Sequence, residues 1–250
     1  MTPLSRAARR ALPLPLVLTA ALALGGCGSD APSANLGLHT PSTPVPTTAP
    51  STPTPTPTPT DDASATATGP SSGAQLVKVT KFGIAFELPR AWLTLDAKKV
   101  LASGGKNPLL DELAHRMGTT PEQLAKTFSA AVQTFSVSGD GAHHGFLDNV
   151  NTVGQEGDVN DEALKFQLAT VGAKPNGFEH ATSAAGDVTR VTYDVPTKIG
   201  LTVHAVAVVV HADGATVVVT ISSSSTAAAA RIADQVQRTL QPIPGRDPGA

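Results

Sequence analysis

The chain has 250 residues, with 18 lysines and arginines, 20 aspartates and glutamates, and a single cysteine. The slightly acidic balance argues against nucleic acid or an anionic membrane surface as the main partner. One cysteine excludes a disulfide framework within the chain, a CxxC redox pair and a thiolate metal site.

The first 26 residues have the three parts of an export signal. Three arginines lie within the first ten residues, and residues 11–24 form an apolar segment. That segment is too short to span a bilayer as a stable helix, and Gly25 and Gly26 end it with small residues. We therefore predict a signal peptide over residues 1–26.

Two cleavage chemistries fit this signal. Residues 21–23, Ala-Leu-Ala, partly match the pattern that a secretory peptidase requires. The stretch Leu24-Gly25-Gly26-Cys27 resembles the lipobox of bacterial lipoproteins, whose cysteine receives a diacylglycerol and becomes the first residue after cleavage. The resemblance implies that Cys27 carries acyl chains such as palmitate. Two or three such chains would hold the protein at the outer face of the bacterial plasma membrane.

A stalk follows the predicted lipid anchor, so that residues 27–74 comprise the cysteine and a linker rich in Pro, Thr and Ser. From Thr40 to Thr60 proline alternates with hydroxyl residues, and there is almost nothing to bury. Such a tract favours extended polyproline II and acts as a semi-rigid spacer. The composition suits O-glycosylation and plain disorder equally well.

From residue 75 to residue 243 the composition is that of one globular domain, followed by a disordered tail over 244–250. Hydrophobic periodicity, helix caps and turn residues predict its elements. The predicted strands cover residues 76–79, 82–89, 134–139, 145–154, 179–184, 188–195, 201–210 and 216–222. The predicted helices are 107–117 (capped by Asn107), 120–132 (opened by a capping box), 158–171 (capped by Asp158, with apolar Leu164, Phe166, Leu168 and Val171) and 226–240 (with Ala230, Ile232, Val236 and Leu240 on one side).

The arrangement of these elements follows from one very apolar strand. Residues 205–210, Ala-Val-Ala-Val-Val-Val, indicate a central strand buried on both faces. The Asp213-Gly214 pair then predicts a hairpin to the next strand. Helices on both sides of the sheet would supply the burial, so the predicted fold class is α+β, a three-layer α/β/α sandwich around a mainly antiparallel sheet.

Three stretches of the domain resemble a known family. The opening FGIAFELPRAW, the FLDNVN strand and the terminal hairpin with its C-terminal helix are similar to the LpqN-type lipoproteins of mycobacteria and related actinobacteria. That family has a PsbP-like (Mog-type) domain, a three-layer sandwich around an antiparallel sheet. The resemblance covers most of residues 76–241, with Ala91 before Trp92 where the family commonly has glycine. It implies the fold and the location, and no agreed catalytic residues.

Several motifs match part of a functional pattern but lack the other features that the function requires. Residues 69–73 read G-x-S-x-G, but they lie in the linker and lack the strand and helix of a nucleophile elbow. Residues 113–126 resemble a helix-turn-helix, but the second helix offers one lysine against one glutamate. The acidic residues around Asp158 lack the glycine and distant glutamate of a calcium loop, and helix capping explains them.

Three residues are candidates for contact with a ligand or partner. Asp148 and Asn149 stand within an apolar strand, where such residues are usually avoided. They would mark a bulge, fix a loop by hydrogen bonds, or contact a ligand. Trp92 is the only tryptophan, and it would either fill the core or line an apolar groove.

The histidines do not suggest a metal or catalytic site. His143 and His144 are adjacent in a glycine-rich turn, where neighbouring side chains point apart. His204 and His211 are seven residues apart on one strand, so pleating places them on opposite faces. We therefore predict no metal, no cofactor and no catalytic residue.

Anchor, stalk and a domain without a catalytic constellation favour a non-enzymatic lipoprotein of the cell envelope. Its domain would bind another envelope protein or a cell-wall component. The first alternative is a carrier or sensor of small apolar molecules, which requires an apolar cavity of several hundred cubic ångströms. The second is a hydrolase, which requires a cleft with close His, Asp or Ser side chains. The sequence leaves the oligomeric state open.

Overall fold

The computed structural model describes residues 70–243, except residues 105, 128–131, 198–199 and 213–214. The predicted signal peptide, Cys27, the lipobox residues Leu24, Gly25 and Gly26, the stalk and the tail 244–250 lie outside the described residues.

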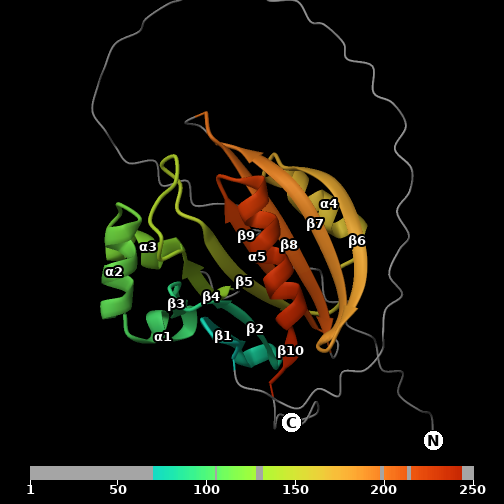
Figure 1. Ribbon diagram of the computed structural model, residues 1–250, viewed down its shortest axis with the longest axis horizontal. Coiled ribbons are helices and arrows are strands. Elements are labelled where there is room, and N and C mark those ends of the chain that lie inside the picture. Colours follow the sequence, from blue (N-terminus) through green and yellow to red (C-terminus); the bar gives the residue numbers. More distant parts are fainter. Residues whose placement is uncertain (1–69, 105, 128–131, 198–199, 213–214, 244–250) are drawn as a thin grey trace, which may run out of the picture. The chain divides into compact units, whose positions relative to one another are not determined.

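A seven-stranded antiparallel sheet forms the centre of the domain (Figure 1). Its strand order is β3-β4-β5-β9-β8-β7-β6, so β9 and β8 lie in the interior and β3 and β6 at the two edges. The strands are β3 (Leu93–Asp96), β4 (Val132–Val137), β5 (Asn149–Glu156), β6 (Lys174–Ser183), β7 (Gly186–Pro196), β8 (Thr202–Ala212) and β9 (Ala215–Ser223).

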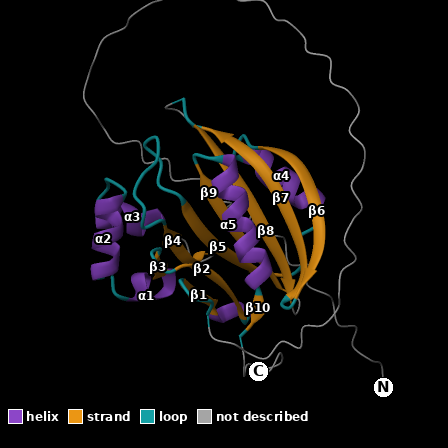
Figure 2. Cartoon of the chain, viewed as in Figure 1, coloured by secondary structure: helices purple, strands orange, loops and turns teal. Residues whose placement is uncertain are grey.

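A second, three-stranded sheet and the helices complete the fold (Figure 2). The small sheet has the order β1-β2-β10, with β1 (Ala74–Val79), β2 (Ile84–Pro89) and β10 (Gln241–Pro242). A 3-10 turn, η1 (Thr80–Phe82), joins β1 to β2. The helices are α1 (Ala97–Ala102), α2 (Pro108–Arg116), α3 (Pro121–Thr127), α4 (Asp161–Thr170) and α5 (Thr226–Thr239). Across the described ranges, every helix lacks the length or the hydrophobicity to cross a bilayer.

The central sheet is buried on both faces, as the apolar run in β8 predicts. Val206, Val208 and Val210 pack into one core with helix α5 and the small sheet. Ala205, Ala207 and Val209 alternate with them and pack into a second core with helices α1 to α4. The α/β/α sandwich is therefore confirmed, with the small sheet sharing one outer layer with α5.

The connection between β1 and β2 packs closely against the large sheet at a glycine. A Cβ atom at Gly154 of β5 would lie only 1.9 Å from the ring of Phe82, which follows β1. The ring therefore occupies the space that a side chain at position 154 would fill. Phe82 lies in η1 and not in a strand as predicted, and it packs against the core beneath α5.

The predicted helix starts at Asn107 and Thr120 are confirmed. The Asn107 side chain accepts a hydrogen bond from the Leu109 backbone N–H at 2.9 Å. Thr120 and Gln123 form the expected capping box, in which the Gln123 backbone N–H donates to Thr120 Oγ1 at 3.2 Å and the Thr120 backbone N–H donates to Gln123 Oε1 at 3.4 Å.

Other local predictions are wrong. Helix α4 is capped by Asn160, which accepts from the Ala163 backbone N–H, and not by Asp158. Phe166 is 73% exposed and is not a core position. Val132 begins strand β4 and does not end a helix. The buried alanines of α5 are Ala229 and Ala233, and not Ala230.

Four elements were not predicted: η1, β3, α1 and β10. Each has six residues or fewer, and periodicity over so short a segment is a weak signal. Strand β10 exists only because Gln241 and Pro242 pair with β2, far away in the sequence.

Candidate functional site

A surface cavity of about 710 Å³ lies beside the N-terminus of α4, at one end of β6, β7 and β8. Helix α4 and the residues before it form one wall, and the three strands form the other. The lining residues are Asp158, Val159, Asn160, Asp161, Glu162, His180, Ala181, Thr182, Asp187, Val188, Thr189 and His211.

Strand register brings the strand residues of the cavity together. His180 of β6 lies opposite Thr189 of β7, and Asp187 of β7 lies opposite His211 of β8. Thr189 has the same parity as Val191, which packs into the core beneath α1 to α4. These side chains therefore point toward the α4 face of the sheet.

The lining carries four carboxylates and no lysine or arginine. Glu162 forms an ion pair with Lys165 of the same helix at 2.6 Å. The hydrogen bond to Glu162, followed by the charges of Glu162 and Asp161, raises the pKa of Lys165. Within the described part of the chain, Asp158 and Asp187 take part in no ion pair, so the cavity keeps an excess of negative charge.

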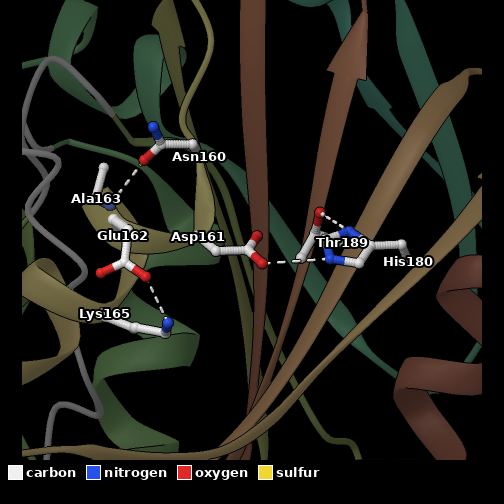
Figure 3. Close-up of polar contacts among 7 residues, drawn as sticks. All are labelled: Asn160, Asp161, Glu162, Ala163, Lys165, His180 and Thr189. Carbon is white, nitrogen blue, oxygen red and sulfur yellow. Dashed lines mark hydrogen bonds and ion pairs between the residues drawn. The ribbon is translucent and has the colours of Figure 1, made fainter.

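His180 links the helix wall to the strand wall (Figure 3). Its Nε2 lies 3.3 Å from Asp161 Oδ2, and its Nδ1 lies 3.1 Å from Thr189 Oγ1. A neutral imidazole fits both contacts when its proton is on Nε2, the nitrogen nearer the carboxylate, and Nδ1 accepts a hydrogen bond from the hydroxyl. Thr189 is buried, whereas the His180 side chain is 62% exposed at the cavity.

This lining suits an organic cation. Carboxylates are acceptors only, so they favour ammonium or guanidinium groups, which are donors only. Across the described residues, no three His, Cys, Asp or Glu side chains are placed to hold a metal ion together. The cavity can therefore recognise a positively charged amine or guanidine.

Comparisons with known proteins concern the fold. No protein-family model matches the sequence, and no curated protein matches it. The chain is similar to the solution structure of cyanobacterial PsbP from Synechocystis sp. PCC 6803, with 14% identity, a TM-score of 0.45, and coverage of 72% of this chain and 98% of that one.

Two other solved structures are similar. One is the Ran-binding protein Mog1p of Saccharomyces cerevisiae, with 10% identity, a TM-score of 0.43, and coverage of 68% of this chain and 95% of that one. The other is LpqN of Mycobacterium tuberculosis, described as involved in cell envelope biogenesis, with 14% identity, a TM-score of 0.39, and coverage of 67% and 89%. The PsbP-like and LpqN-type families named above are thus represented among the similar structures.

The candidate residues Trp92, Asp148 and Asn149 lie away from this cavity. Leu93, Val137 and Asn149 stand in register across β3, β4 and β5, so the three candidates share one corner of the sheet. Asn149 pairs with Ser222 of β9, near the start of β8, whereas the cavity lies at the end of β8.

All three candidates in that corner are buried. Trp92 is 6% exposed and packs into the core beneath α5. The Asn149 side chain donates to the Leu147 carbonyl at 3.1 Å, which fixes the chain before β5. Asp148 Oδ1 is buried without a hydrogen-bond partner among the described residues. Their proposed contact with a ligand or partner stays a prediction.

The predicted turn at His143 and His144, and the placement of His204 and His211 on opposite faces, are confirmed. His143 and Phe146 bracket a tight turn whose central residues, His144 and Gly145, both have positive φ. His204 contacts Asp194 at 2.7 Å on the α5 face, and His211 lines the cavity on the α4 face.

Sequence reasoning missed His180, Asp187 and Thr189 as site residues. They belong to different strands and acquire a common site only through the register of the β6–β7 and β7–β8 pairs. The one local signal for this site is the acidic run before and within α4, and helix capping also explains that run.

Proposed function

We propose that the chain is a lipid-anchored protein of the bacterial cell envelope whose globular domain binds a cationic group of an envelope protein or cell-wall component. Cys27 would hold it at the outer face of the plasma membrane, and residues 28–74 would carry the domain away from the lipid. The single observation that carries the binding proposal is the cavity lined by four carboxylates and no lysine or arginine.

The four carboxylates of the lining argue for this function over an apolar carrier. Nine of the twelve lining residues have polar or charged side chains, and the apolar ones are Val159, Ala181 and Val188. An apolar ligand would have to strip water from the carboxylates without replacing their hydrogen bonds. A cation instead replaces water with a charge-assisted hydrogen bond.

Removing charge from the cavity is expected to weaken binding of a cationic ligand. We expect Asp158→Asn and Asp187→Asn each to weaken binding of amidated tri-lysine about threefold to fivefold, since an exposed charge pair contributes up to ~1 kcal/mol. The double variant should lose about tenfold or more, and added salt should weaken the wild type. Calorimetric titration of the full chain in mild detergent measures these effects.

Asp140→Asn is the matched control, since Asp140 is exposed in the loop at the opposite end of the sheet. It removes the same charge and should leave the affinity unchanged. Equal losses in the Asp140 variant and the cavity variants would mean that only the net charge of the protein matters, which contradicts the proposal.

A hydrolase is the second candidate, because Thr189, His180 and Asp161 lie in the order nucleophile, base and carboxylate, with a hydrogen bond between Thr189 and His180 and an ion-pair contact between His180 and Asp161. Two features argue against it. The threonine contacts Nδ1 and the carboxylate contacts Nε2, the reverse of the usual triad, and Thr189 is only 5% exposed.

We therefore expect the chain to hydrolyse p-nitrophenyl acetate no faster than a Thr189→Val variant does. The substitution keeps the shape of the side chain and removes the hydroxyl. A drop of a hundredfold or more in the rate on making this change would establish the hydrolase and refute the non-catalytic assignment, because a lost nucleophile costs at least that much.

A further inference from the structure

We propose that the outer edge of β6, from Phe178 to Ser183, accepts an extended segment of another protein as an added β-strand, with basic side chains of that segment entering the acidic cavity. The inference rests on the proposed function, because it assumes that the cavity binds a cationic group. It adds the kind of partner and the way in which the partner docks.

Strand β6 has a free edge. It ends the strand order of the large sheet, and within the described residues it pairs only with β7 (Figure 1). Its register with β7 shifts between Pro175 and Gly177, and from Phe178 to Ser183 the pairing is regular. Such an edge offers backbone N–H and C=O groups in the spacing that a further strand requires.

The free edge runs between two cavities on opposite faces of the sheet. His180 and Thr182 line the acidic cavity on the α4 face. A second cavity of about 420 Å³ lies on the α5 face. It is lined by Thr182, Ser183, Ala184, Arg190, Asp234, Gln237, Arg238 and Leu240.

An added strand would send alternate side chains to these two cavities. Successive side chains of a strand point to opposite faces of the sheet. Two positions of the added strand, spaced i and i+2, would lie beside His180 and Thr182 and meet the carboxylates of the acidic cavity. The intervening position would face the α5 side of the sheet, where the second cavity lies.

The second cavity is less selective for the charge of the side chain that faces it. Arg190 forms an ion pair with Asp234 there, which leaves Arg238 as the remaining charged lining residue. Glu179 lies opposite Arg190 on the same face, so these four side chains comprise two acidic and two basic groups. The α5 face therefore favours a neutral polar side chain, and the selectivity for charge lies on the α4 face.

Charge complementarity selects the occupant. Residues 27–69 of this chain contain no lysine or arginine and include three aspartates, so they do not complement the acidic cavity. The β6 edge of a second copy, residues 178–183, also contains no lysine or arginine. The occupant is therefore a segment of a different protein with lysine or arginine at alternate positions.

Two capped peptides test the proposal against the full chain purified in mild detergent. The first, Thr-Val-Lys-Thr-Lys-Val-Thr, places both lysines on one face of a strand. The second has the same composition with the two lysines adjacent, so that only one can reach the acidic cavity. We expect the second peptide to bind about threefold to fivefold more weakly, the effect of one exposed charge pair. Hydrogen exchange should show new protection at Phe178–Ser183 with the first peptide.

Backbone methylation of the first peptide tests strand pairing itself. An added strand uses the N–H of every second residue to pair with its neighbour. Methylation of the amides that face β6 should therefore weaken binding at least tenfold. Methylation of the other set, which points away from β6, should leave most of the affinity. Equal effects of the two methylated sets, or equal affinity for the two lysine spacings, would overturn the proposal. So would dimerisation through β6 that excludes the peptide.

The outcomes separate this inference from the proposed function. If tri-lysine binds with the expected dependence on Asp158 and Asp187 but the peptides show no effect of spacing or methylation, the cavity binds cations and the edge does not add a strand. If the methylation pattern appears without any dependence on Asp158 and Asp187, the edge adds a strand and the charge-based function is wrong.

Discussion

The substitution Cys27→Ala should move the protein from the membrane fraction to the soluble fraction of the cells that produce it. Each acyl methylene buried in the bilayer contributes roughly 0.8 kcal/mol to membrane binding, so two or three chains hold a protein almost permanently. Without the cysteine, no acyl chain is attached. Fractionation followed by immunoblotting measures the change. We expect more than nine tenths of the variant to be soluble, an effect near all-or-none.

Ser29→Ala is the control for this experiment, because it alters a neighbouring side chain and leaves the lipobox intact. It should remain in the membrane fraction. Retention of the Cys27 variant in membranes to the same extent as the control would contradict the lipid anchor and favour another mode of attachment.

Phe86→Ala should lower the free energy of unfolding by about 3–5 kcal/mol, the usual cost of removing a buried phenylalanine side chain. Phe86 of β2 is fully buried in the core between the small sheet, α5 and the large sheet. The side chains around the cavity left behind would lose their contacts with the ring. Urea denaturation of the chain from residue 27 onward, with Cys27→Ala in every variant, measures the difference.

The same substitution at Phe166 provides the matched control. Phe166 is 73% exposed on α4, so Phe166→Ala should change the free energy of unfolding by less than ~0.5 kcal/mol. Similar losses at the two positions would mean that α4 is covered in solution or that the small sheet contributes little to the core.

The error at Phe166 has a simple geometric origin. Leu164 and Leu168 are four residues apart and share the buried face of α4. A residue two positions from each of them lies on the far side of a helix with 3.6 residues per turn. The sequence therefore already contained the information that Phe166 faces outward, and hydrophobicity alone was misleading.

Strong local signals predicted their elements well. Asn107 before Pro108, the capping box at Thr120 and the apolar run in β8 each act within a few residues, so sequence alone reveals them. The cap of α4 was misplaced by two residues because Asp158 and Asn160 are both good capping residues. Only the backbone geometry distinguishes them.

The candidate site could not be predicted in the same way. Its acidic helix wall is local in sequence, but His180, Asp187 and His211 come together through two strand pairs and their register. A shift of one residue in either register would turn these side chains to the other face of the sheet. The sequence predicted the strands, yet the register depends on tertiary packing.

The measurement that most directly tests the central claim locates a bound cation on the domain. Amide chemical shifts of the Cys27→Ala chain from residue 27 onward are followed during titration with amidated tri-lysine. The account predicts saturable shifts at the cavity residues, including Glu162, His180 and Asp187, and none around Asp140. Shifts spread evenly over the surface, or no saturable shift at the cavity, would contradict it.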